Sequence, residues 1–173
     1  VLSLARSSGH VYDLVEGCAL DAHVRDGRLT VAHTFGPCDG CVLMVTERAI
    51  NAVRVNVAQE AHLGGRLSCT ISVVDQEEEP IDAVVPLRVD ILDPAGAQAE
   101  GSGYYGTEHG QLTLTLDLAP NDRRGLWQIS VRELASRRRA TADFRTQDND
   151  HLKTERGTMM YMAKRTGRFR GGR

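Results

Sequence analysis

The residues with the most reactive side chains are the four cysteines, Cys18, Cys38, Cys41 and Cys69. Cys38 and Cys41 have C-x-x-C spacing, which occurs in disulfides, zinc sites and redox centres. The sequence allows a disulfide from Cys18 to either of them, a zinc site completed by His33 or Cys69, or a redox pair. Structural zinc needs a second ligand pair at matching spacing, and a redox C-x-x-C begins a helix. Neither pattern occurs, so structural cysteines, free or disulfide-bonded, are favoured.

Other catalytic or metal-binding motifs are missing from the sequence. No histidine has H-x-x-x-H or H-x-H spacing, and no serine lies within G-x-S-x-G. The acidic stretch from Asp75 to Asp82 lacks the alternating spacing of a calcium loop, which favours a solvated hairpin connection. We therefore expect no catalytic residues, no metal and no cofactor.

One connection carries aromatic side chains that could touch a ligand or partner: Tyr104 and Tyr105, followed by His109. Aromatic residues in the loops of a sandwich bury contact area at low entropic cost. The alternative is that one of the tyrosines covers the sandwich edge. Both interpretations stay open at this stage.

Composition indicates a folded, globular chain. Apolar residues make up 41% of the 173 residues and charged residues 25%, with a net charge of −2. Mixed charges of this kind argue against nucleic acid as the main partner, and no apolar run is long enough to cross a membrane. The sequence opens within a strand-like pattern at Val1, from which we expect a piece of a longer polypeptide whose partners are its own adjacent domains, another protein or a carbohydrate.

The N-terminal elements that position the cysteines are predicted to be strands. Asp26-Gly27 is a strong hairpin signal, because a type I′ turn needs positive φ at both central residues. Pairing outward from this turn joins Val24 to Leu29 and Ala22 to Val31. Continued further, the same register places Leu20 opposite His33, as a core or interface histidine, and Cys18 beside Phe35, close to Cys38. With a further strand at 42–46, residues 1–50 form a β meander or half-sandwich, the end of a truncated domain that needs a partner surface.

Alternating apolar residues continue through residues 51–146 and predict an all-β, immunoglobulin-like antiparallel sandwich. Apolar side chains alternate in the stretches 53–57, 67–73, 85–91, 112–118, 127–131 and 140–144. A short strand near Tyr104 brings the expected number to about seven. Residues 147–173 lose this alternation and form a basic tail that we expect to be partly flexible.

Residues 52–146 resemble the macroglobulin-type MG2 domain and related bacterial immunoglobulin-like domains. The resemblance rests on the Asp93-Pro94-Ala95-Gly96 turn, His109-Gly110, the 112–118 strand and the G-x-W-x-I-x-V strand at 125–131. It implies that Trp127 fills the space between two sheets. A weaker resemblance links residues 9–50, with Gly9-His-Val-Tyr-Asp-Leu14, to the C-terminal β domain of multidomain glycoside hydrolases.

Both resemblances imply a non-catalytic accessory or structural module that mediates domain packing or protein association outside the cytoplasm. The Cys-Gly-Glu-Gln motif of macroglobulin thioesters is absent, so covalent trapping is not expected. Two other hypotheses stay open. One is a carbohydrate-binding module attached to a hydrolase, using Tyr104, Tyr105 or, if its ring is exposed, Trp127; the other is a small metal or redox protein using Cys18, Cys38 and Cys41.

Overall fold

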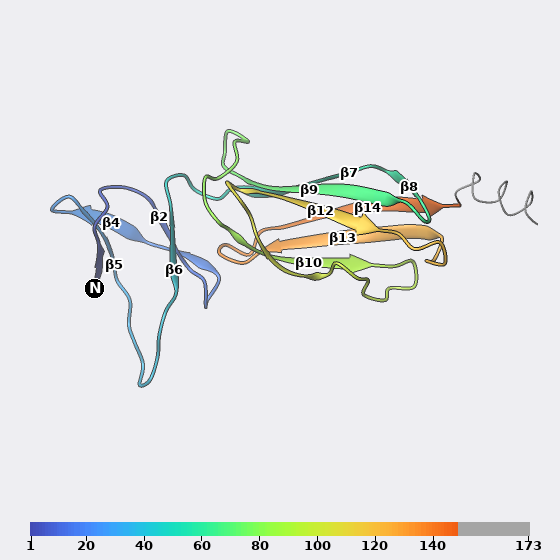
Figure 1. Cartoon of the computed structure of the whole chain (residues 1–173). Coiled ribbons are helices and arrows are strands. Elements are labelled where there is room, and N and C mark those ends of the chain that lie inside the picture. Colours follow the sequence, from blue (N-terminus) through green and yellow to red (C-terminus); the bar gives the residue numbers. More distant parts are fainter. Residues whose placement is uncertain (149–173) are drawn as a thin grey trace, which may run out of the picture.

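The protein is built from strands in two parts that lie end to end. The structure, a computed structural model, describes residues 1–148, and these contain strands and no helix. A small N-terminal unit occupies one end and a larger sandwich the other (Figure 1). The predicted all-β fold is confirmed, and the predicted basic tail, apart from its first two residues, lies outside the described residues.

The N-terminal unit consists of two small sheets around its own core. Its strands are β1 (Leu2–Leu4), β2 (His10–Asp13), β3 (Cys18–Leu20), β4 (Ala22–Arg25), β5 (Arg28–Val31) and β6 (Leu43–Thr46). One sheet has the order β1-β5-β4 and the other β3-β2-β6. Val11, Leu29 and Val31 form the buried core between them. Such a core is small, so the unit depends on the surface that it packs against.

The hairpin predicted at Asp26-Gly27 is confirmed. Both residues have positive φ, 49° and 70°, as a type I′ turn requires. The register joins Val24 to Leu29 and Ala22 to Val31, as predicted. The turn therefore fixed the pairing of the residues next to it correctly.

Further from the turn, the predicted register is wrong. Leu20 pairs with Val11 and Cys18 with Asp13, so neither lies opposite His33 or Phe35. At Asp21, between β3 and β4, the chain passes from the sheet β3-β2-β6 to the sheet β1-β5-β4. No long two-stranded ribbon forms, because β3 pairs with β2 while β5 lies between β1 and β4 and ends at Val31. Residues 32–42, including His33 and Phe35, instead form a connection that projects from the unit (Figure 1).

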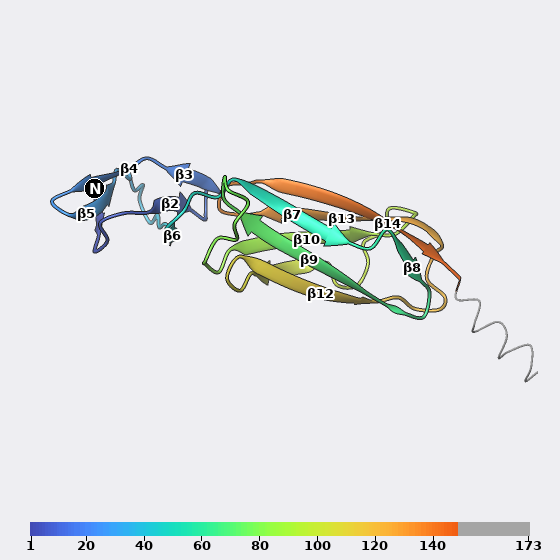
Figure 2. The same cartoon turned by 90° about the horizontal axis from the view of Figure 1, so that it is seen from above.

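The sandwich follows the immunoglobulin-like arrangement. Its strands are β7 (Ala52–Val57), β8 (Glu60–His62), β9 (Arg66–Val74), β10 (Pro86–Leu92), β11 (Gly103–Gly106), β12 (Gln111–Asp117), β13 (Gly125–Glu133) and β14 (Arg139–Gln147). One sheet has the order β11-β10-β13-β14-β8 and the other β12-β9-β7 (Figure 2). All strand pairs are antiparallel except β8 with β14, which is parallel. The first two sandwich strands belong to different sheets, β7 to the three-stranded one and β8 to the five-stranded one. Strand β8 was missed by the sequence because it has one apolar residue, Ala61.

The two sheets close over a core that contains the predicted tryptophan. Trp127 is 5% exposed, and its ring stacks on Phe144 with 5.7 Å between centroids. Its indole N–H donates to the Arg123 carbonyl at 2.9 Å, which satisfies the one polar atom of the side chain. The turn from Asp93 to Gly96 also forms as predicted, because Gly96 adopts a φ of 79° and donates its N–H to the Asp93 carbonyl.

Candidate functional site

The best-defined feature outside the sandwich core is the joint that attaches the N-terminal unit, and Tyr12 is its centre. Side chains alternate along β2, so Val11 enters the small core while Tyr12 enters the sandwich core. Tyr12 is 3% exposed, and its hydroxyl oxygen accepts a hydrogen bond from the buried N–H of Ile50 at 2.8 Å. Leu14 and Met44 pack against the same core. One short strand therefore serves two cores.

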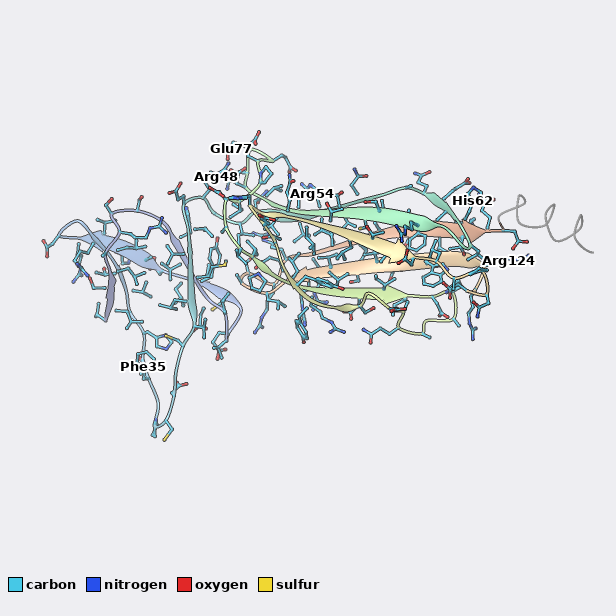
Figure 3. All side chains as sticks on the ribbon, in the orientation of Figure 1. Phe35, Arg48, Arg54, His62, Glu77 and Arg124 are labelled. Carbon is cyan, nitrogen blue, oxygen red and sulfur yellow. The ribbon has the colours of Figure 1, made fainter. Side chains whose placement is uncertain are left out.

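The connection between the two parts is held by Arg48. Its guanidinium pairs with Asp75 and donates to the Pro80 carbonyl at 2.6 Å, which ties the connection to the loop after β9 (Figure 3). Asp75 is 2% exposed, and its second oxygen accepts from the N–H groups of Glu77 and Glu79. The acidic stretch expected to be solvated is thus anchored at its first residue, while the three glutamates that follow are exposed.

A third contact joins the turn between β2 and β3 to the turn between β13 and β14. Arg137 donates to the Glu16 carbonyl. Gly17 has a φ of 62°, and a Cβ there would come within 2.7 Å of the Arg137 Nε and 3.0 Å of the Leu134 oxygen. A side chain does not fit at this position. Buried Glu133 shapes the second turn, because its carboxylate accepts from the backbone of Ala135 and Ser136.

The cysteines do not meet in one site. All four are free thiols: Cys18 and Cys38 are exposed, Cys41 is partly buried and Cys69 is buried. Cys18 lies in β3, whereas Cys38 and Cys41 lie on the 32–42 connection, which Figure 3 shows projecting with Phe35. The proximity that the sequence register implied is therefore lost with that register. Among residues 1–148 no three His, Cys, Asp or Glu side chains are placed to hold a metal ion.

Cys69 is buried in the sandwich, whereas His33 lies on the projecting connection. Cys69 belongs to the sandwich core, as its position in the alternation indicated, and burial raises the pKa of its thiol to about 11. His33 is not a core residue. Its ring packs edge-on against Phe35, with 4.4 Å between centroids, on the projecting connection.

The three residues expected to contact a ligand or partner have different surroundings: Tyr104, Tyr105 and His109. Tyr104 is 71% exposed, and the Arg88 guanidinium lies 4.9 Å from its ring centroid. Tyr105 points the other way, packs against the core and donates its hydroxyl to the Gly101 carbonyl. His109 pairs with Asp82, whose hydrogen bond and charge raise the pKa of the imidazole above its usual value. Tyr105 thus covers the sandwich edge while Tyr104 remains free for contact.

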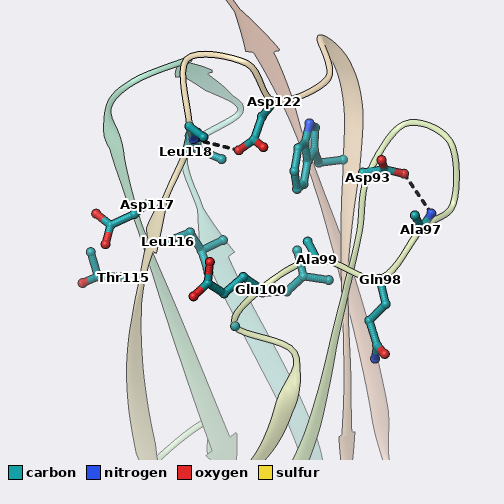
Figure 4. Close-up of a pocket in the computed structure, with 14 residues that line it drawn as sticks. Asp93, Ala97, Gln98, Ala99, Glu100, Thr115, Leu116, Asp117, Leu118 and Asp122 are labelled. Carbon is teal, nitrogen blue, oxygen red and sulfur yellow. Dashed lines mark hydrogen bonds between the residues drawn. The ribbon is translucent and has the colours of Figure 1, made fainter.

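A pocket at the far end of the sandwich was not predicted from the sequence. It has a volume of about 530 Å³ and is lined by residues 93–101 and, distant in the chain, by the end of β12 and the loop after it, residues 115–122, with Trp127 at its wall (Figure 4). Three of its four acids are engaged, among them Asp117, which pairs with Arg66; the fourth, Glu100, is exposed. Asp93 accepts from the Ala95 and Ala97 N–H groups and pairs with Arg123, while Asp122 accepts from the Ala119 N–H. These acids order the loops, as Asp residues do in turns.

The described residues contain no helix long and apolar enough to cross a membrane. Comparisons of the sequence with known protein families and with curated proteins find no match.

Comparison with solved structures finds other chains at low similarity. A PKD domain of an M14-like peptidase from a Thermoplasmatales archaeon is 12% identical, with a TM-score of 0.37; the match covers 58% of this chain and all of that one. The CARDB domain of a Pyrococcus furiosus protein is 14% identical over 56% of this chain and 86% of that one, with a TM-score of 0.36. The adhesin InvE of Yersinia pseudotuberculosis is 11% identical over 83% of this chain and 50% of that one, with a TM-score of 0.45.

Proposed function

We propose that this chain is an accessory or structural module of a larger multidomain protein, and that its N-terminal unit packs against a neighbouring domain or a partner protein. One observation carries the proposal. Of the eight large apolar residues that are exposed between residues 1 and 148, five lie in the N-terminal unit: Val1, Val15, Val24, Phe35 and Val42. A unit with so small a core of its own exposes apolar area at a cost, which a neighbouring surface would remove.

The joint supports this role, because a packing module must hold its contact surface in a fixed orientation. Tyr12, Arg48 and Arg137 connect the unit to the sandwich at three separate places. Two of these contacts are tied to buried groups, the Ile50 N–H and the Asp75 carboxylate. The sandwich then acts as a rigid mount for the unit.

We propose no reaction for the chain. Three of the four acids that line the pocket support this: Asp93 and Asp117 pair with arginines, and Asp122 accepts from a backbone N–H, while Glu100 is the fourth. We also propose that the sandwich is of the macroglobulin type, because the Asp93–Gly96 turn is followed by the Trp127 strand, and that the protein lies outside the cytoplasm.

Exposed Tyr104 beside Arg88 favours a second candidate function, carbohydrate binding.

Side-chain footprinting with hydroxyl radicals tests the packing role. We expect Phe35 to be oxidised several-fold more slowly in the parent protein than in this chain alone, because a neighbouring surface covers it. Leu126, which is 52% exposed on the sandwich, serves as the control and should react equally in both. Equal oxidation of Phe35 in the two forms would overturn the proposal.

A further inference from the structure

Three arginines form a row across the outer face of the five-stranded sheet. Arg88 of β10 pairs with Arg132 of β13, and Arg132 pairs in turn with Arg139 of β14. Tyr104 of β11 pairs with Arg88 and extends the row to a fourth strand. Directly paired residues of an antiparallel sheet share one face, so all four side chains leave the sheet on the same side. Strands β10, β13 and β14 lie side by side in Figure 1.

The row faces away from the core. The residues next to it along the strands, Leu87, Val89 and Val131, are fully buried, and side chains alternate between the two faces of a strand. The arginine row, as we call Arg88, Arg132 and Arg139, therefore lies on the outward face. Exposed Arg138 adjoins it in the preceding turn.

The folded chain leaves most of this charge unbalanced. Arg88 pairs with Asp90 in its own strand and stacks over Tyr104. Arg132 and Arg139 form no ion pair and no side-chain hydrogen bond with any residue between 1 and 148. Like charges that face each other across two strands destabilise a sheet, so the fold itself gains nothing from this arrangement.

We propose that the arginine row, together with Tyr104, binds an anionic polysaccharide. Guanidinium groups bind carboxylate and sulfate through paired hydrogen bonds. Neighbouring strands are about 4.8 Å apart, so the row presents its charges at intervals close to one sugar unit of an extended chain. Exposed Tyr104 supplies an aromatic ring at the end of the row, against which a sugar can pack.

Other polyanions suit the row less well. A peptide that adds to a sheet uses backbone hydrogen bonds at its edge, and the row crosses the interior strands β10, β13 and β14, whose backbone groups are paired. Duplex DNA would meet the same overall charge of −2 as a polysaccharide, so titration with duplex DNA decides between the two. The arginine row lies on the sandwich and the proposed packing surface lies on the N-terminal unit. Polysaccharide binding can therefore be disproved without affecting the packing proposal, and the reverse also holds.

Calorimetric titration of the whole chain with alginate, a polyuronate, and with heparin, a sulfated polysaccharide, tests the proposal and separates its two sources of charge. We expect Arg132→Ser/Arg139→Ser to weaken binding at least about tenfold. The matched control is Arg168→Ser/Arg170→Ser in the basic tail, which removes the same charge and should change binding less than about twofold. Neutral dextran should not bind.

Three outcomes would overturn the proposal. The first is equal affinity of the Arg132→Ser/Arg139→Ser variant and the wild type for the polysaccharides. The second is a loss of affinity in the tail variant as large as the loss in the row variant. The third is tighter binding of polyglutamate or duplex DNA than of either polysaccharide. Folding is checked separately. Removing two facing positive charges should leave the melting temperature unchanged or raise it, and Arg132→Lys/Arg139→Lys should keep part of the affinity because charge remains without the bidentate geometry.

Discussion

Replacing Tyr12 with phenylalanine removes one oxygen atom from the joint and leaves its packing in place. The Ile50 N–H then loses its acceptor at a site where Tyr12 is 3% and Ile50 5% exposed. A buried donor without a partner costs about 1–3 kcal/mol, so we expect the free energy of unfolding to fall by about 2 kcal/mol. For a chain of this size that corresponds to a melting temperature lower by about 4–8 °C.

Urea unfolding followed by the fluorescence of Trp127, the single tryptophan, measures this loss. Tyr105→Phe is the matched control, because its hydroxyl donates to the Gly101 carbonyl at 2.7 Å in a partly exposed place. Water can replace that bond, so the control should lose about 0.5–1 kcal/mol. A loss at Tyr12 no larger than the loss at Tyr105 would refute the description of the joint as buried.

Three further predictions concern single side chains. Glu133→Gln should lower the free energy of unfolding by about 1–3 kcal/mol, since the buried carboxylate accepts from the backbone of its own turn; unchanged thermal unfolding would contradict this role. Cys69 should resist a thiol reagent until the chain unfolds, while the three other cysteines react in the folded state; fast labelling of all four at neutral pH would be inconsistent with its burial. The His109–Asp82 pair should stabilise the fold fully below about pH 6.5 and lose that contribution as pH rises through the raised pKa of His109. An NMR titration should show a lower pKa for His109 in Asp82→Asn, and equal values in the two proteins would disprove the pairing.

The sandwich was predictable because its signals are local and repeated. Alternation places Ile71, Leu87 and Ile129 on inward faces, and all three are buried. Positive φ was predictable at Asp26-Gly27 and at Gly96, because these residue types favour it in turns. Such patterns need no knowledge of distant contacts.

What could not be predicted depends on which sheet a strand joins. Nothing in the alternation of Cys18 to Arg25 indicates that the chain changes sheets at Asp21, and every expectation about Cys18 and Phe35 followed from that register. The joint and the arginine row were missed for a similar reason. Tyr12 reaches Ile50, and Arg88 reaches Arg132, only through long-range packing and pairing.

Comparing two probes in one unfolding experiment tests most directly whether the N-terminal unit is rigidly mounted on the sandwich. Trp127 fluorescence reports the sandwich, and hydrogen exchange at the Leu29 and Val31 amides reports the core of the N-terminal unit. Coincident transitions in urea are expected, because Tyr12 ties the two cores together. If the N-terminal unit unfolded at clearly lower urea while the sandwich stayed intact, the two parts would be independent and the rigid mount would be contradicted.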